Sequence, residues 1–405
     1  LYIDTQEVLK ASAQLQSSGK MVNDRKLLGR IAATRGVLAS FKGDVQGMIQ
    51  HSDLALDLLP KEDLSWRNLT GVILGNAHGF RGDMAAAYNA RYKAMQACEA
   101  AGDLYLIMMS KLELAITLRA QGRLKETLEI CQSQMLVASE NKLLQTRIGG
   151  WLLGVWGETL VELGDLDEGI QRAKEGFLIA EESGDLPIIG WTLFCLIRVL
   201  FSRGDLKEAE ETIQRMEKRS QELQFPAWVT GQLAAWQARI NLRQNKLEEA
   251  SRWVKKQALD PRIGIKPLHE IHLFLLSEYV IVSRILIEQS QLDDAIKLLQ
   301  HLVMAAEKGS RFSKKIEIIT LLSLAYQAKG DTNRAISALK NAFAIAESES
   351  FIQIFVDEGP PMARLLYEAL SRGIAPDYVR RLLAAFPAAE PKATGPSIAQ
   401  TQEAD

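Results

Sequence analysis

The sequence lacks the features that would favour a secreted or general nucleic-acid-binding protein. It has only three cysteines in 405 residues, Cys98, Cys131 and Cys195, and none forms a CxxC pair. This excludes a disulfide framework, and each thiol falls in a helical pattern, where it behaves as a small hydrophobe. Lys and Arg total 48 against 50 Asp and Glu, for a net charge of −2. That balance excludes the basic face that a general nucleic-acid surface needs.

Motifs for catalysis, metal binding and membrane insertion are also missing. No phosphate loop G-x-x-x-x-G-K-[ST] and no Ser-His-Asp or Cys-His set is visible, so we expect no enzyme activity and no cofactor in this segment. His269 and His272 are three apart, but no carboxylate or cysteine completes a metal site at recognisable spacing. The most apolar stretch, 271–287, contains Glu278 and Arg284, which argues against a membrane span.

The location of the protein is also an expectation from the sequence. The chain has no basic-then-apolar leader, so we expect it to be cytoplasmic. It begins at Leu1 without an initiator Met, so we expect it to be a segment of a longer protein.

What the sequence does contain is one turn repeated about every 40 residues. The turns are Gly43-Asp44, Gly82-Asp83, Gly122-Arg123, Gly164-Asp165, Gly204-Asp205, Asn245-Lys246, Ser290-Gln291 and Gly330-Asp331. The Gly suits a left-handed helix C-cap, and the Asp after it can cap the next helix. A period of this length indicates a helical solenoid, in which each unit packs only on its neighbours.

The repeat best formed in the sequence, 320–342, has apolar residues at helical spacing on both sides of its turn and resembles a tetratricopeptide (TPR) repeat. We therefore predict an all-α, right-handed superhelical solenoid of about eight TPR-like helical hairpins. The predicted parts are an N-terminal capping helix at 1–25, the repeats at 26–347, C-terminal capping helices at 348–386 and a flexible, proline-containing linker at 387–405.

A second resemblance lies beyond the last repeat. The run Phe355-Val356-Asp357-Glu358-Gly359-Pro360-Pro361-Met362 is followed by Tyr378-Val379-Arg380-Arg381-Leu382-Leu383-Ala384-Ala385-Phe386. This pattern, F-x-D-E-G-P-x-M and then Y-x-x-x-L-L-x-A-F, resembles the end of the sensor region in MalT-like activators, the large ATP-binding LuxR-type regulators of bacteria. The repeat array is similar to their superhelical TPR domain.

This resemblance implies an effector-sensing domain of a transcription activator. Family members carry an N-terminal ATPase and a C-terminal helix-turn-helix, and neither is visible in this sequence. ATP and DNA are therefore expected to bind only to parts outside it. The partners implied are a small-molecule inducer, other copies of the full-length protein through self-association, and an inhibitory protein partner.

The register of the repeats predicts which side chains face the inner, concave surface. In TPR repeats the residue six positions before the turn anchor faces inward. These residues are Val37, Asn76, Ile116, Glu158, Arg198, Arg239, Arg284 and Leu324. Three consecutive repeats thus place an arginine inward, and the arginine fork suits carboxylate or phosphate oxygens.

Aromatic residues share these inner faces. Trp191, Phe194 and Arg198 lie on one helix face by their spacing, and Gln232, Trp236 and Arg239 on the next. The predicted ligand-binding residues are Trp151, Gly154, Glu158, Trp191, Phe194, Arg198, Gln232, Trp236, Arg239 and Arg284. We expect a small ligand with an apolar or ring portion and an anionic or multiply hydroxylated end.

Three alternatives remain open. The tryptophans could be core residues, as Trp156 is predicted to be, and the arginines could pair with acidic neighbours such as Glu158. The groove could instead clamp a peptide or an inhibitory partner. A third concerns the helix that contains Gly149, Gly150, Gly154 and Gly157. We expect Gly157 to allow close helix contact and Gly154 to leave room beside Trp151 for a ligand, unless the helix breaks at Gly149-Gly150.

Overall fold

The computed structural model describes residues 25–387, apart from the side chain of Ala101. The capping helix predicted at 1–25 and the linker predicted at 387–405 therefore lie almost entirely outside the described residues. Between 25 and 387 the regular structure is helical, with nineteen α-helices and one 3-10 helix and no strand. The predicted all-α class is confirmed.

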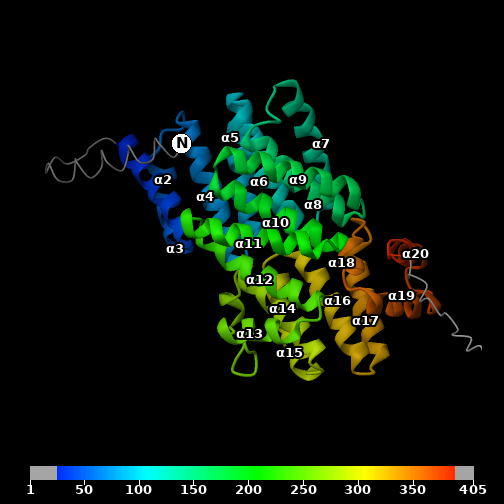
Figure 1. Cartoon of the computed structure of the whole chain (residues 1–405). Helices are drawn as coiled ribbons and strands as arrows, with labels where there is room; N and C mark the ends of the chain where they lie inside the picture. Colours follow the sequence, from blue (N-terminus) through cyan, green and yellow to red (C-terminus); the bar gives the residue numbers. More distant parts are fainter. Residues whose placement is uncertain (1–24, 388–405) are drawn as a thin grey trace, which may run out of the picture.

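The helices form eight antiparallel hairpins that follow one another along the chain (Figure 1). The hairpins are α2 (Arg25–Lys42) with α3 (Val45–Leu58), α4 (Leu64–Arg81) with α5 (Met84–Ala101), α6 (Leu104–Ala120) with α7 (Leu124–Glu140), α8 (Arg147–Glu162) with α9 (Leu166–Ser183), α10 (Leu186–Arg203) with α11 (Leu206–Glu222), α12 (Ala227–Arg243) with α13 (Leu247–Lys256), α14 (Leu273–Glu288) with α15 (Leu292–Lys308), and α16 (Phe312–Ala328) with α17 (Thr332–Ala346). The 3-10 helix η1 (Leu268–Glu270) precedes α14, and α18 (Gln353–Val356), α19 (Pro360–Ser371) and α20 (Pro376–Ala384) complete the described chain.

The repeated turns adopt the backbone conformation that their residues predict. All eight anchor residues have positive φ, from 58° at Ser290 to 96° at Gly164. Glycine adopts this left-handed region without the steric cost that a Cβ brings. The Asp that follows accepts a hydrogen bond from the N–H three residues on, at Asp44, Asp83, Asp165 and Asp331. The anchors therefore end the first helix and the aspartates begin the second.

Glycine sets the close packing of α8 against α9. A Cβ on Gly157 would lie 2.5 Å from the carbonyl oxygen of Gly169, and one on Gly150 would lie 2.8 Å from that of Gly176. Helix α8 is continuous through Gly149 and Gly150, so the predicted alternative of a break there is wrong. Close contact explains Gly157, as predicted.

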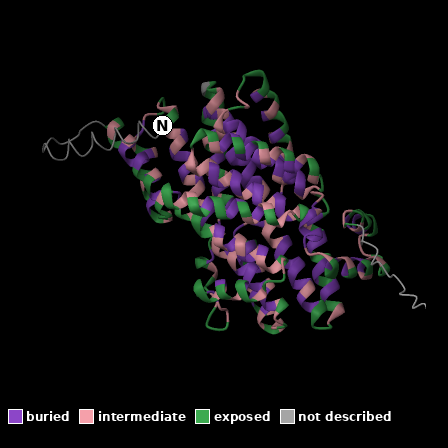
Figure 2. Cartoon of the chain, in the orientation of Figure 1, coloured by how far each residue is buried: buried purple, intermediate pink, exposed green. Residues whose placement is uncertain are grey.

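The solenoid closes on itself, because late helices return against early ones. Helix α14 contacts α4, α16 contacts α6, and α18 contacts α8. The N–H of Met84 donates to the carbonyl of Gly309 at 3.0 Å, and the N–H of Ile352 donates to that of Glu162 at 2.9 Å. Figure 2 shows buried residues concentrated toward the middle of the array and exposed ones at its outer faces. The late helices thus partly cover the inner groove.

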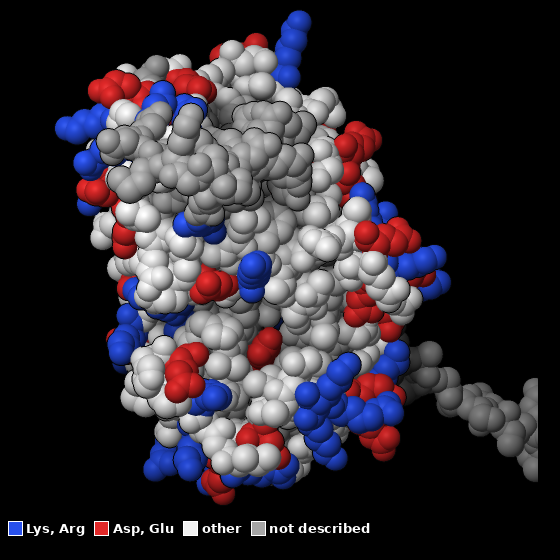
Figure 3. All heavy atoms as spheres, turned by 90° about the vertical axis from the view of Figure 1, so that its left-hand side faces the viewer, with Lys and Arg blue, Asp and Glu red and all other residues white. Residues whose placement is uncertain are grey.

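On the face shown in Figure 3, basic and acidic side chains are interspersed, as the near-zero net charge predicts. Helix α10 is the one helix of residues 25–387 that is long and apolar enough to cross a membrane, and 56% of it is buried. It packs against α8, α9, α11 and α12, so its apolar character is used within the array.

We predict opposite effects for the same substitution at two glycines of first helices. Gly157→Ala should destabilise the protein by roughly 1–3 kcal/mol, because the new Cβ overlaps the α9 backbone. Gly231→Ala in α12 should stabilise by about 0.5–1 kcal/mol, because nothing lies within 4 Å of a Cβ there. Urea unfolding measures both, and a neutral Gly157→Ala would contradict the close packing of α8 on α9.

Candidate functional site

The inner residues of the repeats line two cavities in the closed interior. We name them the Trp236 cavity, of about 240 Å³, and the Arg284 cavity, of about 520 Å³. Of the residues six before the anchors, Asn76, Ile116, Glu158, Arg198 and Arg239 line the Trp236 cavity, and Arg239, Arg284 and Leu324 line the Arg284 cavity. The predicted inward register therefore holds for seven repeats, while Val37 packs in the N-terminal hydrophobic cluster.

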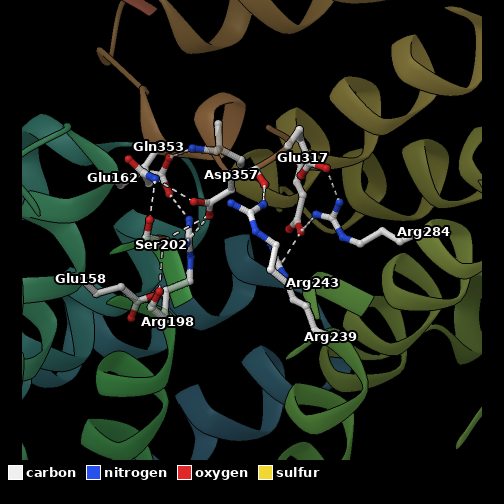
Figure 4. Close-up of polar contacts among 12 residues, drawn as sticks. Glu158, Glu162, Arg198, Ser202, Arg239, Arg243, Arg284, Glu317, Gln353 and Asp357 are labelled. Carbon is white, nitrogen blue, oxygen red and sulfur yellow. Dashed lines mark hydrogen bonds and ion pairs between the residues drawn. The ribbon is translucent and has the colours of Figure 1, made fainter. Parts of the chain in front are cut away.

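A buried ion-pair network lies where the two cavities meet, and Figure 4 shows its polar contacts. The Arg198 guanidinium lies between Glu162, at 3.1 Å, and Asp357, at 2.5 Å. Arg239 and Arg284 share the carboxylate of Glu317, at 3.3 and 2.8 Å.

Two residues of this network border both hollows. Arg239 and Asp357 line the Trp236 cavity and the Arg284 cavity alike. Any displacement of the network therefore changes the walls of both cavities.

The segment that follows the last repeat supplies two of the four carboxylates of this network. Asp357 pairs with Arg198, and its neighbour Glu358 pairs with Arg284 at 2.6 Å. Gln353 donates to Asp357 at 2.7 Å and fixes that carboxylate from within α18. The F-x-D-E-G-P-x-M run thus places two adjacent carboxylates on the inner arginines.

The rest of the motif anchors this segment to the fold. Gly359 has a φ of 67° and precedes Pro360, which is the first residue of α19. Phe355 and Met362 are fully buried. The buried Tyr378 hydroxyl donates to the carbonyl of Phe351 at 2.5 Å.

Charge compensation decides the protonation of the network. Burial alone would raise the pKa of Glu317, but Lys314, Arg239 and Arg284 together hold the pKa of this carboxyl well below its usual range. Burial, with repulsion from Arg284, lowers the pKa of Arg239 to about 10, so it stays charged at neutral pH. Glu317 and Arg239 are therefore both charged at neutral pH.

The wall of the Trp236 cavity also carries two further buried pairs. Arg91 contacts Glu113 at 2.7 Å and also donates to Thr117, and Arg119 pairs with Glu158. Burial, and then the charge of Glu158, raise the pKa of the Cys195 thiol well above its ordinary value. This cysteine is thus held neutral, as expected for a buried thiol.

The remaining wall is aromatic and contains a vacant space. Phe80, Trp191 and Trp236 line the Trp236 cavity, and the Trp191 ring lies 5.0 Å from that of Trp228. Gly79 of α4 also lines it, is buried, and has nothing within 4 Å of an added Cβ. Because glycine has no side chain, this part of the cavity is open.

The ten residues predicted to bind a ligand divide into three groups. Those that line the Trp236 cavity are Glu158, Trp191, Arg198, Trp236 and Arg239. Arg284 lines the Arg284 cavity, and Trp151, Gly154, Phe194 and Gln232 line neither.

The structure corrects the prediction at Trp151 and Gly154, which do not line either cavity. Trp151 is buried in the hydrophobic cluster around α8 and is 4% exposed. A Cβ on Gly154 would meet the Thr192 methyl at 3.1 Å, so α10 occupies the space that the prediction left for a ligand. Phe194 packs on Trp228 at 6.0 Å between ring centroids, and Gln232 is half-buried on α12.

The structure shows the alternative in which the inner arginines pair with carboxylates. Their partners differ from Glu158, the acidic neighbour that the sequence suggested. Glu158 pairs with Arg119, whereas the three arginines pair with Glu162, Glu317, Asp357 and Glu358. Sequence reasoning missed Glu317, Arg311 and Gly79. The adjacent acids at 357–358, within an otherwise apolar segment, were a visible signal for a buried partner.

His269 and His272, the two histidines considered for a metal site, do not form one with other ligands among the described residues. Within residues 25–387 no group of three possible metal-ligating side chains comes together. His272 instead accepts a hydrogen bond from the Leu275 N–H at 3.3 Å at the start of α14.

Comparison with known proteins defines the class. The family model described as the MalT-like TPR region matches residues 29–372. The chain therefore belongs to the MalT-like TPR family. It is 23% identical over 384 residues to the HTH-type transcriptional regulators MalT of Serratia proteamaculans (strain 568) and Yersinia pestis (strain Pestoides F). These alignments cover 93% of this chain and 41% of each relative, so the chain spans about two fifths of their length.

A solved structure shares the fold. The Rap conjugation gene regulator of the plasmid pLS20, in complex with the Phr* peptide, aligns with a TM-score of 0.52 and 17% identity. The alignment covers 89% of this chain and 95% of the regulator. It supports the solenoid of TPR-like hairpins.

We predict that Glu317→Gln destabilises the protein by about 3–5 kcal/mol, because two buried arginines and the half-buried Lys314 lose their shared counter-charge. Glu249→Gln, at an exposed pair with Arg252, should cost less than about 1 kcal/mol. Urea unfolding at neutral pH measures both.

We also predict how the free energy of unfolding of Glu317→Gln depends on pH in the acid range. Because folding lowers the pKa of Glu317, its contribution is complete above the unfolded-state pKa of about 4.3. That contribution is lost as the pH falls through the lower folded value. The wild-type loss in this acid range should be smaller in Glu317→Gln, and identical acid limbs would contradict the assignment.

Proposed function

We propose that this chain is the effector-sensing domain of a bacterial transcription regulator and binds a small-molecule inducer in the Trp236 cavity. The observation that supports this most directly is a hollow inside the superhelix whose wall combines aromatic rings with buried charges. Ligand pockets are concave, mostly apolar and contain a few fixed polar groups. The proposal assigns no catalytic step to the chain and places the protein in the cytoplasm.

An inducer would control the full-length protein by acting on the C-terminal segment 353–358, which contains α18, Asp357 and Glu358. Asp357 of the C-terminal segment lines the cavity and pairs with Arg198. A ligand shifts a conformational equilibrium only as far as it binds the two states unequally. An inducer that contacts this wall would therefore bind differently to states in which α18 is docked or displaced, and displacement would favour self-association.

The resemblance and the relatives support the wider role. The curated relatives are transcriptional regulators more than twice as long as this chain. By analogy, an ATP-dependent ATPase and a DNA-binding helix-turn-helix would belong to parts outside this sequence.

A protein-interaction role is the second candidate. The Rap regulator of similar fold is complexed with a peptide, and a peptide or an inhibitory protein could bind the inner surface here. A peptide running along many repeats needs a continuous channel, whereas the network of Arg198, Arg239 and Glu317 divides this interior into separate hollows. We therefore favour a compact ligand.

We predict that Gly79→Leu abolishes inducer binding without unfolding the protein. The leucine side chain would fill the Trp236 cavity, because no atom lies within 4 Å of a Cβ added at Gly79. Leucine also has a higher helix propensity than glycine, so the helix should remain folded. A metabolite library screened by thermal shift on the wild type would identify ligands, since a ligand at 100 times its dissociation constant stabilises by about 2.7 kcal/mol.

Gly231→Leu is the matched control, because Gly231 is exposed, lies in a first helix and also has open space. Hits should persist in Gly231→Leu and disappear in Gly79→Leu. A confirmed hit that binds Gly79→Leu as tightly as wild type would place the ligand elsewhere and overturn the proposed cavity.

A further inference from the structure

The Arg284 cavity contains two arginines that the ion-pair network does not use. Arg243 is the last residue of α12, and Arg364 lies in α19, beyond the last repeat. Both residues line the cavity, and both are exposed. The fold thus brings two accessible guanidinium groups from distant parts of the chain to one hollow.

Neither arginine has a carboxylate partner among residues 25–387. Arg243 Nη1 donates to the main-chain carbonyl of Asp357 at 2.5 Å (Figure 4), and its guanidinium lies 5.6 Å from the centroid of the Phe201 ring. Arg364 forms no hydrogen bond or ion pair within the described part of the chain. A guanidinium carries five N–H donors, so most donors of this pair are free to bind a ligand.

The acids beside these arginines are mostly paired with other cations. The carboxylate of Asp357 pairs with Arg198, and that of Glu358 pairs with Arg284. Glu288 is exposed in the same wall and forms no ion pair with the described residues. The unpaired side chains of the cavity therefore carry two positive charges against one negative charge, which favours an anion.

The rest of the wall is largely apolar and would contact more than a bare inorganic ion. The apolar residues that line the cavity are Phe201, Leu242, Ile287, Leu321, Leu324 and Pro361. Its volume of about 520 Å³ is ordinary for a small-molecule pocket. An apolar lining with a few convergent polar groups is the usual composition of such pockets.

We propose that the Arg284 cavity is a second binding site, which takes a small amphipathic anion. A carboxylate or phosphate group pairs with the free donors of Arg243 and Arg364, since the arginine fork matches the oxygens of both groups. The apolar portion of the ligand lies against Leu242, Ile287 and Leu324. This site goes beyond the effector proposed for the Trp236 cavity, and it holds or fails independently of that effector.

Hexanoate and hexyl phosphate are the probes, and hexanamide is their neutral counterpart with the same chain length. Each is titrated by calorimetry into the 405-residue chain in chloride buffer at matched ionic strength. At least one anion should bind saturably and about tenfold more tightly than hexanamide, because charge-assisted hydrogen bonds are the stronger ones. Binding of hexyl phosphate alone assigns a phosphoryl ligand, binding of hexanoate alone assigns a carboxylate, and binding of both shows that the site accepts either group.

The combined Arg243→Met and Arg364→Met variant tests the two arginines. Its affinity for the anionic probe should fall by at least about tenfold, to the level of hexanamide, and each single variant should be intermediate. Arg35→Met is the matched control, because Arg35 is also exposed, also lacks an ion pair among the described residues and lies on α2. It should bind the probe as the wild type does.

Two further variants test the place of the anion without removing an arginine of the site. Glu288→Gln removes the unpaired acid of this wall and should raise the affinity for the anionic probe by about twofold at low salt. Gly79→Leu, which fills the Trp236 cavity, should leave the affinity unchanged.

The proposal is overturned if neither anion binds more tightly than hexanamide, or if the combined arginine variant binds like the wild type. Loss of probe binding in Gly79→Leu would also contradict it, because the anion would then occupy the Trp236 cavity. If the combined variant does not fold, an unchanged or lower affinity in Glu288→Gln rejects the site. The metabolite screen with Gly79→Leu and Gly231→Leu still tests the effector cavity if this second site fails.

Discussion

The structure depends on one constraint, which is that buried arginines need carboxylates. Three consecutive repeats place Arg198, Arg239 and Arg284 on the inner wall, where each side chain is at most 13% exposed. An uncompensated charge in such a place costs several kcal/mol. Apart from Glu162 of the preceding hairpin, their partners come from distant parts of the chain, at 317 and 357–358. Charge compensation thus brings α16 and α18 into the groove and turns an open solenoid into a closed one.

The ion pairs that close the superhelix also shape the two cavities and link them to the C-terminal segment. The network leaves a small cavity on one side and a larger one on the other, and Arg239 and Asp357 border both. A ligand in the Trp236 cavity therefore lies beside the contacts that dock the end of the chain. The same wall can hold the fold together and respond to an effector.

The repeat architecture was accessible from sequence because it is local. A Gly-Asp turn and helical spacing recur within each hairpin, so the turns followed from the period, and seven of the inner residues followed from the register of TPR repeats. The candidate site depends on what lies opposite each residue. Gly154 points inward by register, yet Thr192 of the next hairpin occupies its space. The partner of Arg239 lies 78 residues away, and periodicity within a repeat carries no information about that closure.

The most direct test of this account is a double-mutant cycle on Arg198 and Asp357, with Arg198→Met, Asp357→Asn and the combined variant compared by urea unfolding. Docking of the C-terminal segment on the inner arginines predicts a coupling free energy of roughly 1–3 kcal/mol, as expected for residues in one ion-pair network. Effects that add to within about 0.3 kcal/mol would show that the two residues act independently. That result would contradict closure of the superhelix by its own charges.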